Sequence, residues 1–165
     1  MGNIFKRVSV REYQDKKVED RKIELLLKAA MASPSAGNQQ PWEFYAVKEK
    51  AVLEQLASAS PYSGCTARAP FAVVPCYRTE GLRFAECVQI DMSACCENIL
   101  LEAVDQGLGA VWLGIAPVKE RMDAVSKILD LPAHLKAFAI IPCGYAAKET
   151  GQQDRYDPAR VYFVG

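Results

Sequence analysis

The chain has 165 residues, half of them hydrophobic, and its 20 Lys and Arg residues balance 20 Asp and Glu residues. This length and composition exclude a disordered chain and favour one domain over residues 1–165, which would bury about 70% of its unfolded surface. The balanced charge gives no reason to expect nucleic acid or an anionic membrane as a partner. The N-terminus shows no secretory signal or membrane-spanning run, so a cytoplasmic protein is the default expectation.

The cysteine pattern indicates free thiols. None of the six forms Cys-x-x-Cys, and neighbouring Cys95 and Cys96 would point about 100° apart on a helix. The single histidine, His134, has no nearby cysteine with which to share a metal. We therefore expect buried free thiols in a reducing compartment, and neither a metal site nor a disulfide framework.

Residues 3–13 are mixed basic and apolar. If this segment is extended, Arg7, Ser9 and Arg11 fall on one side and could converge on an anion such as a phosphate. A solvated basic face is the alternative. Next comes a helix for which Asp20 is a plausible N-cap. Its apolar residues recur at helical spacing and predict one buried stripe, formed by Ile23, Leu26, Leu27, Ala30 and Met31.

Residues 34–42 read Pro-Ser-Ala-Gly-Asn-Gln-Gln-Pro-Trp and predict an ordered loop. The prolines fix the backbone, and Gly37 allows a positive φ. Ser35, Asn38, Gln39 and Gln40 supply hydrogen-bond donors and acceptors, which suit the edge of a flat heteroaromatic ring. A structured turn without a ligand is the plainer interpretation of this composition.

The following segments alternate between strands and helices. We expect strands at residues 43–47, 71–77, 109–115 and 137–143, and the continuous apolar run at 71–77 indicates a central strand. Val52, Leu53 and Leu56 mark one helix; Pro117 begins another, with Val118, Met122, Val125 and Ile128 or Leu129 on its apolar side.

Residues 86–106 form the longest predicted helix and leave little polar face, so the fold or a partner must bury it. Gly107 is well placed to end this helix. The strand at 109–115 ends at Leu113-Gly114, where Gly114 would let a ligand come close to the backbone. An ordinary turn from the strand into the next helix is the alternative. The tail, residues 148–165, carries Arg155 and ends in Val161-Tyr162-Phe163-Val164, which predicts a terminal strand on its own sheet or a partner's. For Arg155, a plain surface arginine is the alternative.

Three segments together resemble motifs of the nitroreductase family. They are Arg7-Val8-Ser9-Val10-Arg11, the loop at residues 34–42, and Gly-Leu-Gly-Ala-Val-Trp-Leu-Gly at residues 107–114. They occur in the family's order, and the resemblance runs over nearly the whole chain. Gly144-Tyr145 also resembles the family's Gly-Tyr-Pro, with Ala146 in place of the proline.

The resemblance implies an α+β fold with a central, mostly antiparallel sheet flanked by helices, in an intertwined homodimer. FMN would lie at the dimer interface, and the helix at residues 86–106 would follow the two-fold axis. A charge placed on the apolar face of that helix, for example at Ile99, is then expected to separate the subunits and release flavin.

The resemblance also implies roles for particular residues. The phosphate would be held by Arg7, Ser9, Arg11 and Arg155, with Val8 contributing only backbone. The ring would be contacted by Pro34, Ser35, Ala36, Asn38 and Gln40, while Leu113 and Gly114 would lie beside flavin N5. No side chain is expected to act as acid or base, because the flavin carries the reaction.

The implied activity is FMN-dependent hydride transfer in a ping-pong sequence, from NADH or NADPH to an acceptor such as a nitroaromatic or a quinone. The link at residues 78–84 is shorter than the helical excursion of larger relatives, so we expect an open, poorly selective pocket. Because the link is short, an alternative to the enzyme is a non-enzymatic flavin-binding or regulatory protein whose pocket is too open for a nicotinamide. A structural dimer without a cofactor is a third possibility.

Overall fold

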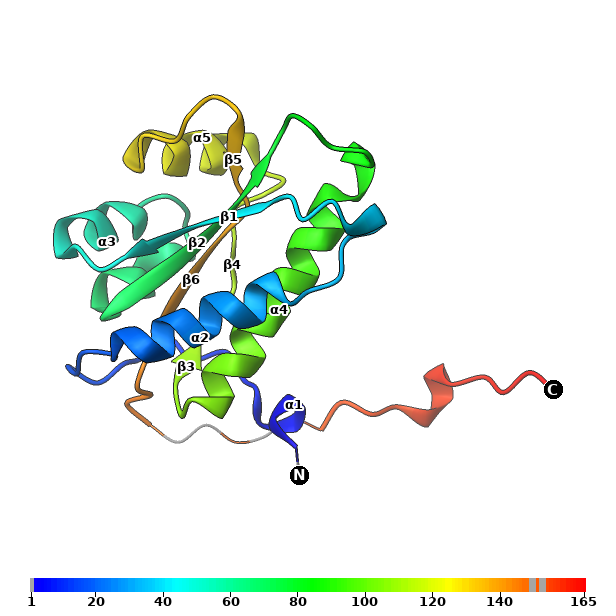
Figure 1. The fold of residues 1–165 in the computed structure, drawn as a ribbon. Helices are drawn as coiled ribbons and strands as arrows, with labels where there is room; N and C mark the ends of the chain where they lie inside the picture. Colours follow the sequence, from blue (N-terminus) through cyan, green and yellow to red (C-terminus); the bar gives the residue numbers. More distant parts are fainter. Residues whose placement is uncertain (1, 149–150, 152–153) are drawn as a thin grey trace.

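A central sheet lies between two layers of helices in the computed structural model, which describes residues 2–148, 151 and 154–165. Helices α2 (Asp20–Met31) and α4 (Val88–Asp105) cover one face, while α3 (Lys50–Leu56) and α5 (Lys119–Ile128) cover the other (Figure 1). Each interface has its own hydrophobic core. Within the described residues, no helix is long and apolar enough to cross a bilayer.

The sheet of the described residues has six strands and confirms the predicted α+β fold. Its main path is β1 (Trp42–Val47), β2 (Phe71–Arg78), β6 (Ala139–Gly144) and β3 (Gly109–Ala110). Two short strands lie off this path: β4 (Leu113–Gly114) pairs with β6, and β5 (Leu135–Ala137) pairs with β2. All these pairs are antiparallel, and β2 is interior and buried nearly throughout, as predicted.

The strand predicted at residues 109–115 is interrupted, and Pro142 explains the break. Ala110 lies opposite Cys143 and Leu113 lies opposite Ile140, so the register is the same on both sides of the gap. Val111 therefore lies opposite Pro142, where its N–H reaches the proline carbonyl at 3.4 Å. Proline has no N–H to donate to Val111 O, so the second hydrogen bond of this residue pair is missing.

Helix α2 differs from its prediction at both ends. Glu19, not Asp20, is the N-cap residue, and the carboxylate of Asp20 instead accepts a bond from Lys48 Nζ at 2.5 Å. Ile23, Leu26 and Ala30 are buried as expected, but Met31 is 55% exposed. Met31 is the last residue of the helix, and its side chain lies outside the buried stripe.

Helix α4 is the most deeply packed helix face of the fold. A 3₁₀ turn over Ala85–Cys87 leads into it. Its inner side consists of fully buried residues: Met92, Cys95, Cys96, Ile99 and Ala103. Burial of Ile99 inside the single chain overturns its use as an interface probe, because a charge there would enter the core. The exposed apolar residue on this helix is Ile90, at 69%.

Helix α4 ends in a Schellman motif, as the position of Gly107 predicted. Gly107 has φ +70°, and its N–H donates to Val104 O at 3.1 Å. The N–H of Leu108 donates to Ala103 O at 2.7 Å, and both of these side chains are buried. The left-handed glycine thus satisfies the last carbonyls and sends the chain directly into β3.

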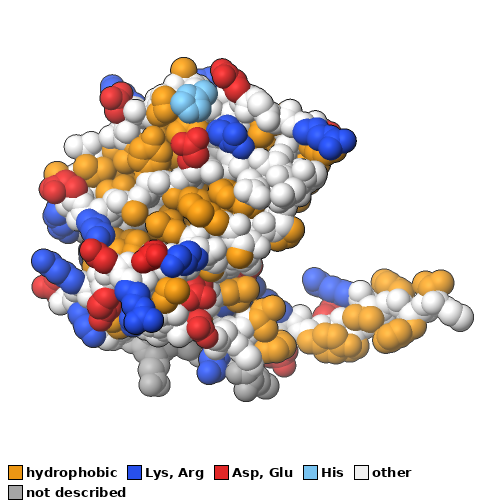
Figure 2. Space-filling view, viewed as in Figure 1, with side chains coloured by type: hydrophobic (Ala, Val, Ile, Leu, Met, Phe, Trp, Pro, Cys, Tyr) orange, Lys and Arg blue, Asp and Glu red, His pale blue; other side chains and the backbone are white. Residues whose placement is uncertain are grey.

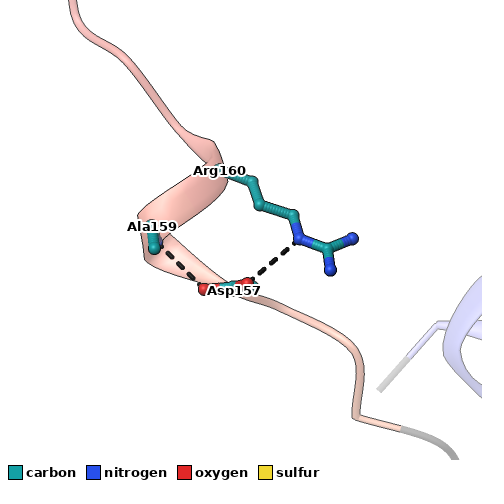
Figure 3. Close-up of polar contacts among 3 residues, drawn as sticks. All are labelled: Asp157, Ala159 and Arg160. Atoms are coloured by element: carbon teal, nitrogen blue, oxygen red, sulfur yellow. Dashed lines mark hydrogen bonds and ion pairs between the residues drawn. The ribbon is translucent and has the colours of Figure 1, made fainter.

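The tail does not form the strand predicted for its own sheet. Its described residues 154–165 project past α1 (Asn3–Lys6), and the apolar side chains Tyr156, Val161, Tyr162, Phe163 and Val164 lie exposed along it (Figures 1 and 2). Ser9 already bridges to Ala110 at the β3 edge, which removes that place for pairing. A local turn lies at Pro158–Arg160, where Asp157 accepts bonds from Ala159 N–H and Arg160 Nε at 3.0 Å (Figure 3).

Replacing Gly109 by alanine should destabilise the protein. A Cβ at Gly109 would lie 2.7 Å from the Cβ of Val10, a stiff β-branched side chain that cannot move aside. Such overpacking costs about 1–3 kcal/mol of unfolding free energy. Urea unfolding measures the loss, and Gly64→Ala is the control because nothing lies within 4 Å of a Cβ there. Equal stability of the two variants would contradict the close approach.

Candidate functional site

The N-terminal arm, residues 7–13, runs extended beside β3. Ser9 forms a parallel bridge with Ala110, and the N–H of Val10 donates to Ala110 O at 3.0 Å. Val10 is buried, whereas Ser9 and Arg11 on either side of it are exposed. The expected alternation is therefore present, although residues 3–6 before the arm form the short helix α1.

Arg7 begins the arm and is directed toward α4. Its Nε lies 3.5 Å from Glu97 Oε1, and the arginine side chain is 21% exposed. A pair of this kind near the surface adds little stability. It orients the guanidinium, whose remaining N–H groups can still bind an anion. Val8, the next residue, is half-buried.

The ring loop, residues 34–41, has an unusual backbone. A 3₁₀ turn covers Ala36–Asn38, and three residues have positive φ: Gly37 and Asn38 at 55° and Gln40 at 45°. The non-glycine residues cost roughly 1–3 kcal/mol each in such conformations, so the surrounding structure must hold them. Ser35 Oγ accepts from the N–H of Gln40, and Gln40 Nε2 donates to Asn38 Oδ1, both at 3.0 Å.

These contacts bring the predicted ring residues together. Pro34, Asn38 and Gln40 are exposed, whereas Ser35 and Ala36 are half-buried. The exposed amides keep unused donor and acceptor positions, since the bond between them engages only one end of each. The loop can therefore offer mixed hydrogen-bonding groups to a ligand from a fixed backbone.

Asp91, in the first turn of α4, anchors this loop, and sequence reasoning missed it. The residue is only 5% exposed. One carboxylate oxygen accepts the N–H of Ala36 at 2.9 Å, and the other accepts Gln39 Nε2 at 2.6 Å. Its signal in the sequence was an acidic residue between apolar Ile90 and Met92 in a helix predicted to be buried, where a carboxylate needs hydrogen-bond partners.

Gln39 points inward rather than toward a ligand. Its Nε2 also donates to Phe84 O, and its Oε1 accepts the N–H of Phe84, both at 3.1 Å. The donor and acceptor that the sequence showed at Gln39 are therefore used inside the protein, and Gln39 was not among the residues expected to contact the ring. The buried carboxylate of Asp91 draws the amide inward.

The link, residues 78–84, folds onto the ring loop. Arg78 Nη2 donates to Gln39 O at 3.1 Å and to Gln40 O at 2.9 Å. The ring of Phe84 lies so close to Gly37 that a Cβ there would be 2.6 Å from Phe84 Cε2. The link is short, as the sequence indicated, but it is bound to the loop near both of its ends.

The end of β4 supplies backbone rather than side chains. Leu113 is buried in the core beneath α3 and α5, so only its main chain can serve a ligand. Gly114 is exposed, and nothing lies within 4 Å of a Cβ built there. Arg121 Nη1 donates to Gly114 O at 3.1 Å and so fixes this turn.

The predicted site residues do not form one cluster within a single chain. The ring loop joins the first turn of α4 at Asp91, whereas Arg7 meets Glu97 and Asn3 Nδ2 donates to Asp105 at the helix end. Asp91 and Glu97, the contacts of the loop and the arm on this helix, are about 9 Å apart at 1.5 Å rise per residue. Arg155 lies exposed in the tail, which projects from the body (Figure 1).

The buried thiols are unsuited to catalysis. Five of the six free cysteines are buried, and Cys87 is half-buried. Burial raises the pKa of Cys76, Cys95 and Cys143 to about 12, so these thiols stay protonated at neutral pH. Over residues 2–148, 151 and 154–165, no three His, Cys, Asp or Glu side chains are grouped for a metal ion.

Comparison with known proteins gives consistent matches. The sequence model of the nitroreductase family matches residues 4–61 and 60–145. A Methanothermobacter thermautotrophicus protein, provisionally named NADH dehydrogenase/NAD(P)H nitroreductase, is 36% identical over 159 residues, covering 96% of this chain and 83% of the relative. A crystal structure provisionally named NADH oxidase, from Clostridium acetobutylicum, has TM-score 0.95 and 41% identity over 99% of both chains. A Desulfovibrio desulfuricans structure, provisionally named a nitroreductase and solved with FMN, has TM-score 0.84 and 26% identity, covering 99% of this chain and 95% of that one.

Proposed function

The chain belongs to the nitroreductase family, and on that premise we propose that it is an FMN-dependent NAD(P)H oxidoreductase. The observation that carries the proposal is the ring loop, whose strained backbone is fixed by Asp91 with the Asn38 and Gln40 amides exposed. When bound, FMN would accept hydride from NADH or NADPH and pass it to an acceptor such as a nitroaromatic or quinone in a ping-pong sequence.

In this proposal the N-terminal arm holds the phosphate. Arg7, Ser9 and Arg11 provide two guanidinium groups and a hydroxyl on an extended backbone, and Val8 provides its main chain. Arg155 of the tail is proposed as a further phosphate ligand. The pairing with Glu97 is through Arg7 Nε, and the proposal assigns the terminal nitrogens of the guanidinium to the anion.

The ring loop orients the isoalloxazine ring. Asn38 and Gln40 would hydrogen-bond its polar edge, while Pro34, Ser35 and Ala36 would contact it through backbone and small side chains. The backbone of Leu113 and Gly114 would lie beside N5, since Gly114 is exposed and lacks a side chain that could block the approach. No side chain is assigned as acid or base.

A homodimer with FMN at its interface is part of the proposal. The phosphate arm and the ring loop are separated along α4, so the ring loop of one subunit would cover FMN held by the arm of the other. The outer side of α4 carries exposed or half-buried apolar residues on both sides of Glu97: Ile90, Ala94, Leu101 and Val104. The projecting apolar tail supports the same arrangement, with Tyr162 and Phe163 covered by the partner.

The function is tested by a flavin absorption spectrum followed by addition of reduced nicotinamide. We expect purified protein to bind one FMN per subunit and NADH or NADPH to bleach the flavin rapidly under anaerobic conditions. Because the link is short, KM for the nicotinamide should be high, and bulky acceptors should be tolerated. Flavin that binds but is not reduced would favour the non-enzymatic flavin protein, and failure to bind flavin would reject the proposal.

Arg11→Ala should weaken FMN binding by about 1.5–3 kcal/mol, because hydrogen bonds to charged groups are worth that much. Riboflavin lacks the phosphate, so its affinity should change far less. Titration of both ligands by flavin fluorescence measures the difference. Arg21→Ala, on the exposed side of α2, removes the same charge elsewhere and should change neither affinity. Equal losses for FMN and riboflavin would contradict the phosphate role.

Ile90→Glu should dissociate the dimer and release FMN together, because it places a charge among the apolar residues on the outer side of α4. Unlike Ile99, Ile90 is outside the core, so the subunit should stay folded. Sedimentation at several concentrations, read with flavin absorbance, follows both events. Gln55→Glu, at an exposed position of α3, adds the same charge as a control. A folded monomer that retains stoichiometric FMN would rule out the shared site.

A further inference from the structure

We infer that Asp91 and Gln39 are positioning residues that couple flavin binding at the ring loop to the conformation of the link. This inference rests on the proposed function and adds a role for residues that the family motifs do not assign. Both side chains face away from the proposed ring position and toward the interior of the protein. They would therefore act through the segments that they hold together.

The burial of Asp91 is the first step in the argument. A carboxylate only 5% exposed must be hydrogen-bonded, because desolvation of an unpaired charge is costly. Its two partners, the Ala36 N–H and the Gln39 amide, both belong to the ring loop. Both of these hydrogen bonds therefore tie α4 to the loop.

Gln39 carries the connection onward to the link. Its Nε2 is shared between Asp91 and the carbonyl of Phe84, while its Oε1 receives the N–H of Phe84. The side chain thus pairs with both main-chain groups of Phe84. Since Arg78 bonds to the carbonyls of Gln39 and Gln40, the link is held to the loop near both of its ends.

Steric contact prevents the two segments from moving independently. The ring of Phe84 packs on Gly37, leaving too little room even for a Cβ, and the loop has positive φ at three positions. Displacing the link would remove the contacts that hold this backbone. A ligand that binds only this loop conformation would also stabilise the link, and the linkage is reciprocal.

Asp91→Asn and Gln39→Ala test the coupling. In Asp91→Asn, an amide NH₂ can face the Gln39 NH₂; flipping the Gln39 amide would only move the mismatch to Phe84. Gln39→Ala removes the connection from a half-buried loop position and leaves the bond from Ala36 to Asp91, so the core should stay folded. Asp105→Asn is the matched control, because it changes an exposed carboxylate on the same helix that also accepts an amide.

Three measurements distinguish positioning from general stability: FMN affinity, the split between KM and kcat, and amide hydrogen exchange of residues 78–84 with and without FMN. We expect each single variant to weaken FMN binding about tenfold, the lower part of the range for a buried unsatisfied group. FMN should protect the link in the wild type and not in the variants. KM for the acceptor should rise, while kcat at saturating FMN and substrates stays within about twofold.

The double variant decides whether the two residues act as one unit. If they do, the double variant should bind FMN as tightly as the single variant with the lower affinity, because either single substitution already breaks the connection between α4 and the link. Additive losses, or link protection by FMN that persists in the variants, would overturn the inference. If the wild type binds FMN and the two variants bind it as tightly as Asp105→Asn does, the coupling is wrong but the proposed function stands. A wild type that binds no FMN would overturn the proposed function as well.

Discussion

The need to satisfy one buried carboxylate governs the arrangement of the candidate site. Asp91 lies on the helix that fills the main core, with no cation among its recorded partners, so its charge depends on hydrogen bonds from the ring loop. Those bonds determine which way the loop faces. Because the inward amide of Gln39 satisfies the carboxylate, its neighbours Asn38 and Gln40 remain available on the outer side. A core requirement thus selects the ligand-facing groups.

The same bonds make a strained loop conformation persist. Asn38 and Gln40 have positive φ, which a free loop would leave by relaxing to ordinary backbone conformations. Here the carbonyls of Gln39 and Gln40 are held by Arg78, and the amide of Ala36 is held by Asp91. The loop is therefore organised before any ligand arrives, and pre-organisation reduces the entropy that binding would otherwise cost.

The sequence predicted what depends on local pattern and missed what depends on contacts between distant segments. The central strand β2, the cap glycine Gly107 and the extended arm were predictable from periodicity and glycine chemistry. The break between β3 and β4 was not, because it arises from Pro142 on a neighbouring strand. Likewise, periodicity shows that α4 is apolar on most sides but not which side faces inward. Ile99 was therefore expected to face the partner subunit, whereas it is buried in the core of its own chain and Ile90 is exposed.

The two sides of α4 explain why one subunit is an incomplete site in our proposal. The inner side of the helix is packed in the core. The loop contacts the helix at Asp91, and the arm contacts it at Glu97, further toward its C-terminus. Moving them closer within one chain would require breaking the contacts that define each segment. A two-fold axis beside the outer side would bring one subunit's loop to the other subunit's arm without disturbing either. In this proposal, the exposed apolar residues of α4 around Ile90 and the exposed apolar side chains of the tail (Figure 2) have one explanation, which is that the partner subunit covers both and completes the site.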